Sequence, residues 1–332
     1  MIEPIPHLQP PEVNRDRVHA PICAQASMET KNSFTRGGMK RLRYQLAPPP
    51  RFAPQGTYVG ELQEKWAFPS DHLPIGAVLD GIKVISWNVL NPLFIGWVID
   101  KNSQGLSRSQ IAQEHIPMPN SSITIRENHI IEELLSMIKK GQSVLSLQEC
   151  GTPFLNELEA RLPSGFCLLR EQKGIVNNQN AVIYNNQELT VLEQRAPVGV
   201  FSQTSHSFQD ILFKRKGDLG LVRIVNAHLP GDPIGPARFE FASYLKQSHQ
   251  ADIPTVALGD MNFNELEMQE AFQASPFAIY TPYCTNVAPN ILVSKAIDHF
   301  IVEGFSAIAM QKPDAISPGL SRLVSLLTQE NI

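Results

Sequence analysis

Polar residues of the types used in catalysis stand where strongly apolar runs of the sequence end. The six are Asn88, Glu149, His228, Asp260, Asn262 and Asp298. A carboxylate at the edge of a core is unfavourable unless it is paired or bound to a metal. Singly, each residue also has a structural explanation: Glu149 as an exposed strand end, Asn88 as a turn former, His228 as a satisfied core histidine. The set therefore has to be judged from its order.

Together these residues form an ordered series of short motifs. The series is Ser86-Trp87-Asn88, Leu147-Gln148-Glu149, Asn226-Ala227-His228-Leu229, Gly259-Asp260-Met261-Asn262 and Ile297-Asp298-His299-Phe300. In order and spacing it resembles the motifs of the endonuclease/exonuclease/phosphatase superfamily, whose members have a deoxyribonuclease I-like fold. The resemblance covers most of the chain and implies an enzyme that hydrolyses phosphate esters with Mg²⁺, or with Mn²⁺ in its place.

The resemblance also implies a role for each position. Glu149 and Asn88 would bind Mg²⁺, which prefers oxygen ligands and keeps several waters. The ion would polarise a phosphoryl oxygen and offset the charge that develops on the leaving group. Asp260 would activate or orient the attacking water, and Asn262 would hold the nucleophile and phosphate in register.

Two histidine roles follow from the same resemblance. His228 would donate a hydrogen bond to the scissile phosphate. Asp298 matches the aspartate that orients the superfamily's C-terminal histidine and fixes its tautomer. That histidine normally follows within a Ser-Asp-His motif, but here the segment 317–321 has neither Asp nor His. His299 is no substitute, because neighbours on a strand point to opposite faces.

The missing motif occurs instead ahead of the first strand, in the run Ser70-Asp71-His72-Leu73-Pro74. Domains whose ends lie close together tolerate circular permutation, and Asp80-Gly81 supplies a tight turn where the old ends would be joined. The alternative is a coincidental motif and a decayed site. In the permuted arrangement His72 protonates or stabilises the phosphorane and is oriented by Asp298. Asp71 then lies near the metal.

The expected fold is α+β, a four-layer α/β/β/α sandwich of two mixed β-sheets. The usual last strand, about 70–79, precedes the usual first strand, about 82–89. Asp-Gly favours the type I′ turn of a hairpin at 80–81. The periodicity predicts helices at 126–140, 154–162 and 237–247, and strands at 144–147, 180–184, 221–228, 255–258 and 296–302. Gly141 is expected to cap the first helix.

Composition sets limits on compartment and partners. The chain has 332 residues, 42% hydrophobic and 18% charged, with a net charge of −4, which gives no bulk attraction to nucleic acid. Its four cysteines lack metal-site spacing, so reduced thiols are expected. There is no apolar run of membrane-spanning length and no signal-peptide pattern. We therefore expect a cytoplasmic protein, or one exported by a signal that the sequence does not reveal; protein partners are not readable.

Three segments are distinguished along the chain. Residues 1–55 form an irregular, Pro-rich N-terminal segment with a basic cluster at Lys40-Arg41-Leu42-Arg43, which is either a solvated charge run or a nucleic-acid contact. Residues 56–332 form the catalytic domain. Within it, about 314–332 is expected to add an amphipathic helix packed on the outside.

The substrate is less constrained than the chemistry. Trp87-Asn88-Val89-Leu90 and Asn180-Ala181-Val182-Ile183-Tyr184 resemble strands of the deadenylase and nocturnin branch. Tyr280 and Tyr283 precede the Asp298 strand, where they could stack on a base or pack the loop. These features favour hydrolysis of a phosphodiester in single-stranded nucleic acid or a nucleotide. The alternatives are an inositol-phosphate or phosphoinositide phosphatase and a non-catalytic scaffold.

Overall fold

The computed structural model describes residues 70–94, 118, 120–171, 178–195, 206–217, 220–231, 236–281, 286–287 and 294–316. These residues all belong to one compact unit, Pro48–Ile332. The predicted N-terminal segment, its basic cluster, the greater part of the predicted C-terminal helix and Tyr283 lie outside the described residues. Cys150 and Cys167 are free thiols, and Cys23 and Cys284 also lie outside.

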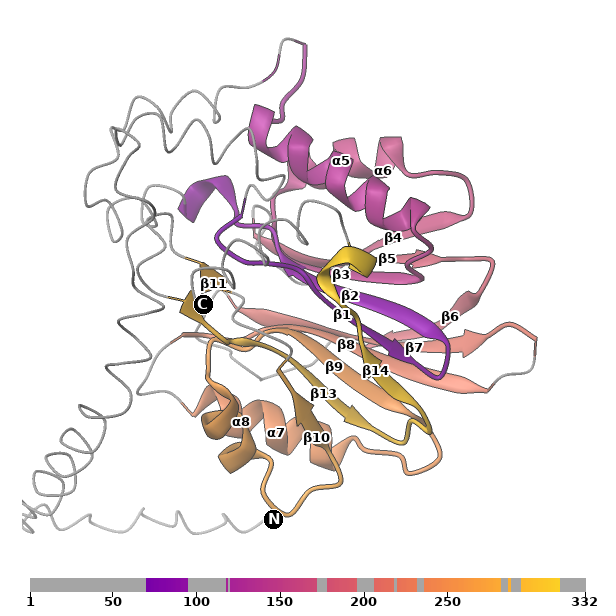
Figure 1. The fold of residues 1–332 in the computed structure, drawn as a ribbon, viewed down its shortest axis with the longest axis vertical. Helices are drawn as coiled ribbons and strands as arrows, with labels where there is room; N and C mark the ends of the chain where they lie inside the picture. Colours follow the sequence, from indigo (N-terminus) through magenta and orange to yellow (C-terminus); the bar gives the residue numbers. More distant parts are fainter. Residues whose placement is uncertain are drawn as a thin grey trace, which may run out of the picture. The chain divides into compact units, whose positions relative to one another are not determined.

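Two six-stranded mixed sheets form the centre of this unit (Figure 1). The first has the order β14-β1-β2-β3-β5-β4, and the second the order β10-β13-β9-β8-β7-β6. In the first sheet the strands are β1 (Ile75–Leu79), β2 (Ile82–Asn88), β3 (Val144–Cys150), β4 (Phe166–Arg170), β5 (Gln179–Asn185) and β14 (Ile308–Met310). In the second they are β6 (Leu189–Arg195), β7 (Ser207–Arg215), β8 (Leu221–His228), β9 (Thr255–Asp260), β10 (Ala278–Tyr280) and β13 (Asp298–Glu303).

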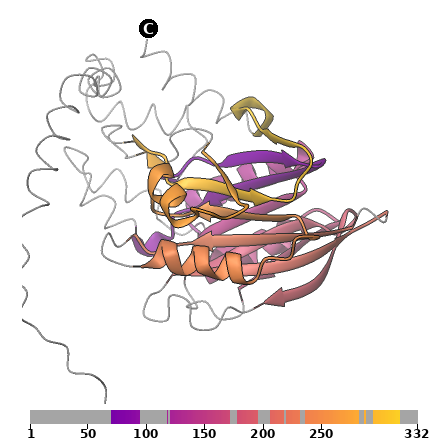
Figure 2. The same cartoon turned by 90° about the horizontal axis from the view of Figure 1, so that it is seen from below.

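Helices cover the outer faces of both sheets. α5 (Ile125–Lys139) and α6 (Thr152–Arg161) pack on the first sheet, and α7 (Ala237–Gln247) and α8 (Glu265–Ala271) pack on the second. A third apolar cluster, which includes Val84, Val182, Ile224 and Phe300, fills the space between the sheets. Figure 2 shows the two sheets as stacked layers, with the orange α7 against the outside of the second. The predicted α/β/β/α sandwich of two mixed sheets is confirmed.

Each sheet contains one parallel pair of strands, joined by a helix. β2 pairs with β3 through α5, and β8 pairs with β9 through α7. The sequence specifies the ends of α5: Thr124 and Glu127 form a capping box at its start, and Gly141, with φ of 81°, follows its end. Because parallel strands run the same way, the residues at their carboxyl ends are delivered to one edge of the sheet.

The predicted hairpin joins β1 to β2. Asp80 and Gly81 have φ of 45° and 87°, as a type I′ turn requires. The Asp80 carboxylate accepts hydrogen bonds from the N–H groups of Ser306 and Ala307, at 3.0 and 2.6 Å. These bonds hold the hairpin tip against the loop that leads into β14. β14 then pairs antiparallel with the other edge of β1.

The remaining elements are short: η1 (Pro92–Phe94), a ribbon of β11 (Asn286–Val287) and β12 (Ser294–Lys295), and α9 (Pro313–Ile316). Over the described ranges, no helix has both the length and the apolar character needed to cross a bilayer.

Candidate active site

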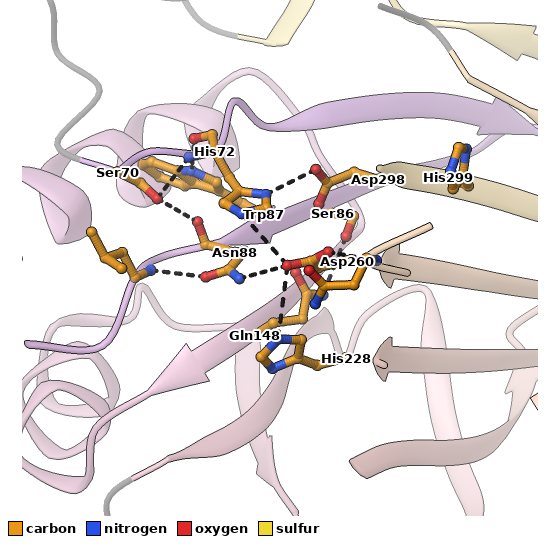
Figure 3. A network of polar contacts seen from close by, with 12 residues as sticks. Ser70, His72, Ser86, Trp87, Asn88, Gln148, His228, Asp260, Asp298 and His299 are labelled. Carbon is orange, nitrogen blue, oxygen red and sulfur yellow. Dashed lines mark hydrogen bonds and ion pairs between the residues drawn. The ribbon is translucent and has the colours of Figure 1, made fainter. Parts of the chain in front are cut away.

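The candidate site lies where the parallel strand pairs of the two sheets end (Figure 3). Asn88 ends β2, Glu149 lies one residue before the end of β3, His228 ends β8 and Asp260 ends β9. The Nδ2 atom of Asn88 donates across the sheets to Asp260 Oδ2 at 3.0 Å, and also to Glu149 Oε1 at 2.9 Å. Four residues from four strands thus meet at one point, which is buried or nearly so.

A histidine–aspartate pair completes this cluster. His72 Nδ1 lies 2.9 Å from Asp298 Oδ2, and His72 Nε2 lies 3.5 Å from Asp260 Oδ2. Asp298 begins β13, directly opposite Asp260 in the β13–β9 register. The two partners of the pair are 226 positions apart in the chain, so the fold and not local sequence brings them together.

The segment that carries His72 is fixed to β2. The Trp87 indole N–H donates to the backbone oxygen of His72 at 2.9 Å, and the Ser70 hydroxyl donates to the backbone oxygen of Asn88 at 2.7 Å. Ser70 Oγ also accepts from the His72 N–H at 3.2 Å. Ser70 of the motif and Trp87 of β2 therefore set the position of the segment that carries the imidazole.

The two site histidines, His72 and His228, have pKa values shifted in opposite directions. Burial alone would lower the pKa of His72, but the carboxylates of Asp298, Asp260 and Asp71 hold that pKa well above its ordinary value. Burial and the charge of His72 lower the pKa of His228 to about 3. At neutral pH one imidazole is therefore cationic and the other neutral.

His228 faces the carboxylates, and a second histidine packs beside it. Its Nε2 atom lies 3.6 Å from Glu149 Oε1 and 3.8 Å from Asp260 Oδ2. The ring of His206, half-buried, meets the His228 ring edge-on with centroids 4.5 Å apart. Sequence reasoning missed His206, which lies just ahead of a strand with no motif of its own.

Asp260 is a carboxyl group with an unusual proton affinity. Burial raises its pKa to about 7, and the nearby charges of Asp298 and Glu149 act in the same direction, against His72 and the Asn88 amide. Its other oxygen, Oδ1, accepts from the N–H of Asn262 at 2.9 Å. The Asn262 side chain donates to Leu229 O at 2.8 Å, so the residue links the ends of β8 and β9.

The ends of two site strands have uncommon backbone conformations. Glu149 and Asn262 have φ of 60° and 54°, uncommon for residues with a side chain. Gly259, with φ of 149°, leaves no room for a side chain, because a Cβ there would lie 1.9 Å from Ala227 O. The glycine of the Gly-Asp-x-Asn motif is thus explained by close approach of β9 to β8.

Two amides beneath the site join the sheets. Gln148 Nε2 donates to Asn226 Oδ1 at 2.6 Å, and Asn226 Nδ2 donates to the backbone oxygens of Leu147 and Ala181 at 2.9 and 3.0 Å. Both residues belong to the motif series, where they carry no predicted role. Their contacts show why these positions are polar although they are fully buried.

The donor set fits a hard divalent cation. Oxygens of Glu149 and Asp260 lie within 4.8 Å of one another and of a ring nitrogen of His228. A second group within the same limit joins His72, Asp260 and Asp298, where the cationic His72 leaves the two carboxylates as the possible ligands. Asp71 Oδ1 is buried and has no hydrogen-bond partner among the described residues. A cluster of carboxylates with an orphaned oxygen is the environment in which Mg²⁺ or Mn²⁺ is bound.

The Asn88 amide lies between two carboxylates of the cluster. Its amide nitrogen faces Glu149 and Asp260, while its Oδ1 atom accepts from the Leu90 N–H at 2.9 Å. In this orientation Asn88 holds the two carboxylates in place, and its predicted role as a metal ligand stays a prediction.

The remaining predicted residues lie further from the cluster. His299 faces away, as strand alternation predicts, and its ring nitrogens lie 2.7 Å from both Thr281 Oγ1 and Phe263 O. Tyr280 is half-buried on β10 and packs against the apolar cluster between the sheets. Its predicted role in stacking on a base stays a prediction.

No protein-family model and no curated protein matches the sequence. Solved structures similar to the fold include humanized D. rerio TDP2, with 13% identity, a TM-score of 0.48, and coverage of 72% of this chain and 86% of that one. ANGEL2, described as a 2′,3′-cyclic phosphatase, has 13% identity, a TM-score of 0.47 and coverage of 70% and 86%.

A third similar structure is described as an endonuclease/exonuclease/phosphatase family protein from Bacteroides thetaiotaomicron. It has 18% identity, a TM-score of 0.47 and coverage of 70% of this chain and 83% of that chain. These three TM-scores are below 0.5, so a proposal of function has to rest on the geometry of the candidate site.

Proposed function

We propose that this chain is a phosphoesterase of the endonuclease/exonuclease/phosphatase type, dependent on Mg²⁺ or Mn²⁺, that cleaves a phosphodiester by in-line attack of water. One observation carries the proposal: His72 Nδ1 lies 2.9 Å from Asp298 Oδ2, and the same imidazole reaches to 3.5 Å from Asp260. A cationic imidazole oriented by one carboxylate and adjoining another supplies the acid and the base that hydrolysis requires.

We also propose that the catalytic domain is circularly permuted relative to that superfamily. In the superfamily that this chain resembles, the Ser-Asp-His motif lies near the C-terminal end of the domain. In this chain it precedes the first strand. Support comes from the β1–β2 hairpin and from β14, which pairs with the other edge of β1. A chain joined through Asp80 and Gly81 would have this strand order.

The residues of the cluster divide the chemistry between them. His72 donates from Nε2 to the phosphorane or to the leaving oxygen, while Asp298 fixes the ring. Asp260 takes up the proton of the attacking water, since a base with a pKa of about 7 is well matched to neutral pH. His228 donates to a phosphate oxygen. Asn262, whose N–H binds Asp260 Oδ1, keeps that carboxylate aligned with the attacking water.

Glu149 and Asp71 would hold the ion, with Asn88 orienting Glu149. When bound, the ion supplies Lewis-acid polarisation of a phosphoryl oxygen and charge compensation for the leaving group. The buried Asp71 Oδ1 atom, which has no hydrogen-bond partner among the described residues, supports a cation there.

For the substrate we propose single-stranded nucleic acid or a nucleotide. The support is the resemblance of Trp87 to Leu90 and of Asn180 to Tyr184 to the deadenylase and nocturnin branch. The second of these segments lies in β5. Its Ala181 pairs with Leu147 of β3, which is two residues before Glu149. The start of β5 therefore lies beside the cluster that contains Glu149.

The test is hydrolysis by the full chain with Mg²⁺ and then Mn²⁺. Oligo(A), inositol phosphates and phosphatidylinositol phosphates are offered in parallel. We expect cleavage of oligo(A) that stops with chelator. His72→Gln and Asp260→Asn should each lower the rate by about 10²–10⁴-fold. His299→Gln is the matched control, a buried histidine next to Asp298 that faces away from the cluster, and it should retain activity once folding is verified by circular dichroism.

The other outcomes separate the parts of the proposal. Cleavage that survives His72→Gln would overturn the permuted site but not the phosphoesterase. Cleavage of inositol esters alone would replace the substrate class. No hydrolysis, together with no binding of Mg²⁺ or Mn²⁺, would leave a non-catalytic scaffold.

A further inference from the structure

A buried arginine lies behind the loop that follows β2. Arg126 is the second residue of α5 and is only 4% exposed. Its Nη1 atom donates to Val89 O at 2.9 Å, and its Nη2 atom donates to Leu90 O at 2.5 Å. A buried cation is unfavourable unless its donors are used. Here the planar fork of the guanidinium is fixed by two successive backbone carbonyls.

The N–H groups of the same two peptide units point the other way, toward the candidate site. Leu90 N donates to Asn88 Oδ1 at 2.9 Å, and Asn91 N donates to Glu149 Oε2 at 3.0 Å. In a trans peptide the carbonyl and the N–H point in opposite directions. By binding the carbonyls from behind, Arg126 therefore aims both N–H groups at site residues.

This loop needs an external restraint. Leu90 has φ of 54°, a left-handed conformation that is uncommon for a residue with a large side chain. Such strain persists only where surrounding contacts impose it. The two bonds from Arg126 are among the contacts that impose it here, together with the bond from Val89 N to Gln148 O at 3.1 Å and the bond from Leu90 N to Asn88 Oδ1.

We propose that Arg126 is a positioning residue, whose fork sets the Val89–Asn91 loop so that its N–H groups hold Asn88 against the two carboxylates and hold Glu149 in the orientation used to bind the metal. Its consequence for catalysis rests on the proposed function. The loop geometry itself is a property of the protein without metal or substrate. The positive charge also acts on the neighbouring acid, since Arg126 opposes the effect of burial on the pKa of Asp71.

The test replaces the fork but keeps the charge. Arg126→Lys retains a cation, yet a point ammonium does not reproduce the planar, two-pronged geometry. Arg161→Lys is the matched control. Arg161 also contacts α5, through Asn128 at 2.7 Å and Glu132, but its partners lie away from the candidate site.

Two measurements are made on the full chain. Amide hydrogen exchange of Leu90 and Asn91 is followed in the metal-free protein, and Mn²⁺ is titrated by calorimetry. In Arg126→Lys we expect the two amides to exchange at least about tenfold faster and the Mn²⁺ affinity to fall about 10–100-fold, the usual effect of removing an outer support of a metal ligand. Exchange in β3 and β9 should be unchanged, and Arg161→Lys should match the wild type.

Three results would overturn the inference. The first is Mn²⁺ affinity and loop exchange within twofold of wild type in Arg126→Lys. The second is faster exchange spread through both sheets, which would mark a residue that only stabilises the fold. The third needs no variant: Leu90 and Asn91 amides that already exchange freely in the metal-free wild type.

Failure of the proposed function looks different. If no phosphate ester is cleaved by the wild type, but Arg126→Lys loses loop protection and Mn²⁺ affinity as expected, the positioning role stands and the assigned activity fails.

Discussion

Two buried aspartates of the second sheet have opposite surroundings. Asp210, on β7, is fully buried and is held by Arg223, with Nε to Oδ1 at 2.9 Å and Nη2 to Oδ2 at 2.7 Å. The Tyr244 hydroxyl adds a third bond at 2.5 Å. Asp260, at the end of β9, instead shares the Asn88 amide with Glu149 and lies beside His72, which is bonded to Asp298.

The difference lies in how the charge is balanced. Around Asp210 one arginine neutralises one carboxylate, with its other donors bound to Ser248 O and Ser248 Oγ at 3.0 and 2.7 Å. Around Asp260, carboxylates outnumber the single cationic imidazole, and burial, which His72 and the Asn88 amide do not offset, raises the pKa of Asp260 to about 7. A balanced buried pair serves the fold, whereas a cluster with excess negative charge is a candidate for ligand binding and catalysis.

Asp260→Asn should separate activity from stability. The amide keeps the shape but removes the base, so kcat/KM on the best substrate should fall about 10²–10⁴-fold. Because the lost charge was poorly compensated, the metal-free variant should unfold at equal or higher urea than wild type. Steady-state kinetics and urea titration in chelator measure the two effects. A variant that loses stability as it loses activity would show that Asp260 also supports the fold.

Asp210→Asn should do the reverse. It leaves the Arg223 cation buried without its counter-charge, and breaking such a pair lowers the free energy of unfolding by about 3–5 kcal/mol. Activity per folded molecule should stay unchanged, since Asp210 does not contact the candidate site. The Asp210→Asn, Arg223→Met double variant, which removes both charges, should recover part of the loss in urea titrations. Full stability in the single variant would contradict the comparison.

Sequence reasoning worked where polar residues directly end apolar runs. The predicted strands at 221–228 and 255–258 correspond to β8 and β9, and the helix at 237–247 to α7. His72 and Asp298 could be paired only through a motif, because nothing in the local pattern links positions so far apart. Buried partners without a motif escaped prediction. Arg223, Asp210 and Tyr244 come from three separate elements.

The orientation of the Asn88 side chain and two strands at the sheet edges could not be predicted from the sequence either. The direction of the Asn88 amide depends on contacts from β3 and β9. β6 and β4 were missed because neither sequence alternates regularly between apolar and polar residues. β4 is a short continuous apolar run, which periodicity alone does not distinguish from a helix segment.

The pH dependence of stability should differ between wild type and Asp260→Asn in chelator. Asp260 has its pKa raised from 3.8 to about 7 in the folded state, so the folded protein binds more protons in that window. Its contribution to stability therefore falls as pH rises from about 4 to about 7, by on the order of a few kcal/mol. His206 and His228, with lowered pKa values of about 4 and about 3, act oppositely but in both proteins.

The comparison is made by urea titration at pH 5 and pH 8. The wild type should lose stability relative to Asp260→Asn at the higher pH. Parallel profiles would mean that the charge of Asp260 is already balanced within the fold, as that of Asp210 is.

Tyr244→Phe gives the smallest effect and the finest test of the Asp210 cluster. It keeps the ring, which lies 5.6 Å from the Arg223 guanidinium, and deletes only the hydroxyl bonded to Asp210. A hydrogen bond to a charged group contributes about 1.5–3 kcal/mol, and Asp210 keeps its bonds to Arg223, so the loss should lie at the lower end. In the Asp210→Asn background the same change should have little effect, because the charged acceptor is gone. An equal loss in both backgrounds would mean that the hydroxyl stabilises the protein through another partner, and the balance around Asp210 would then rest on Arg223 alone.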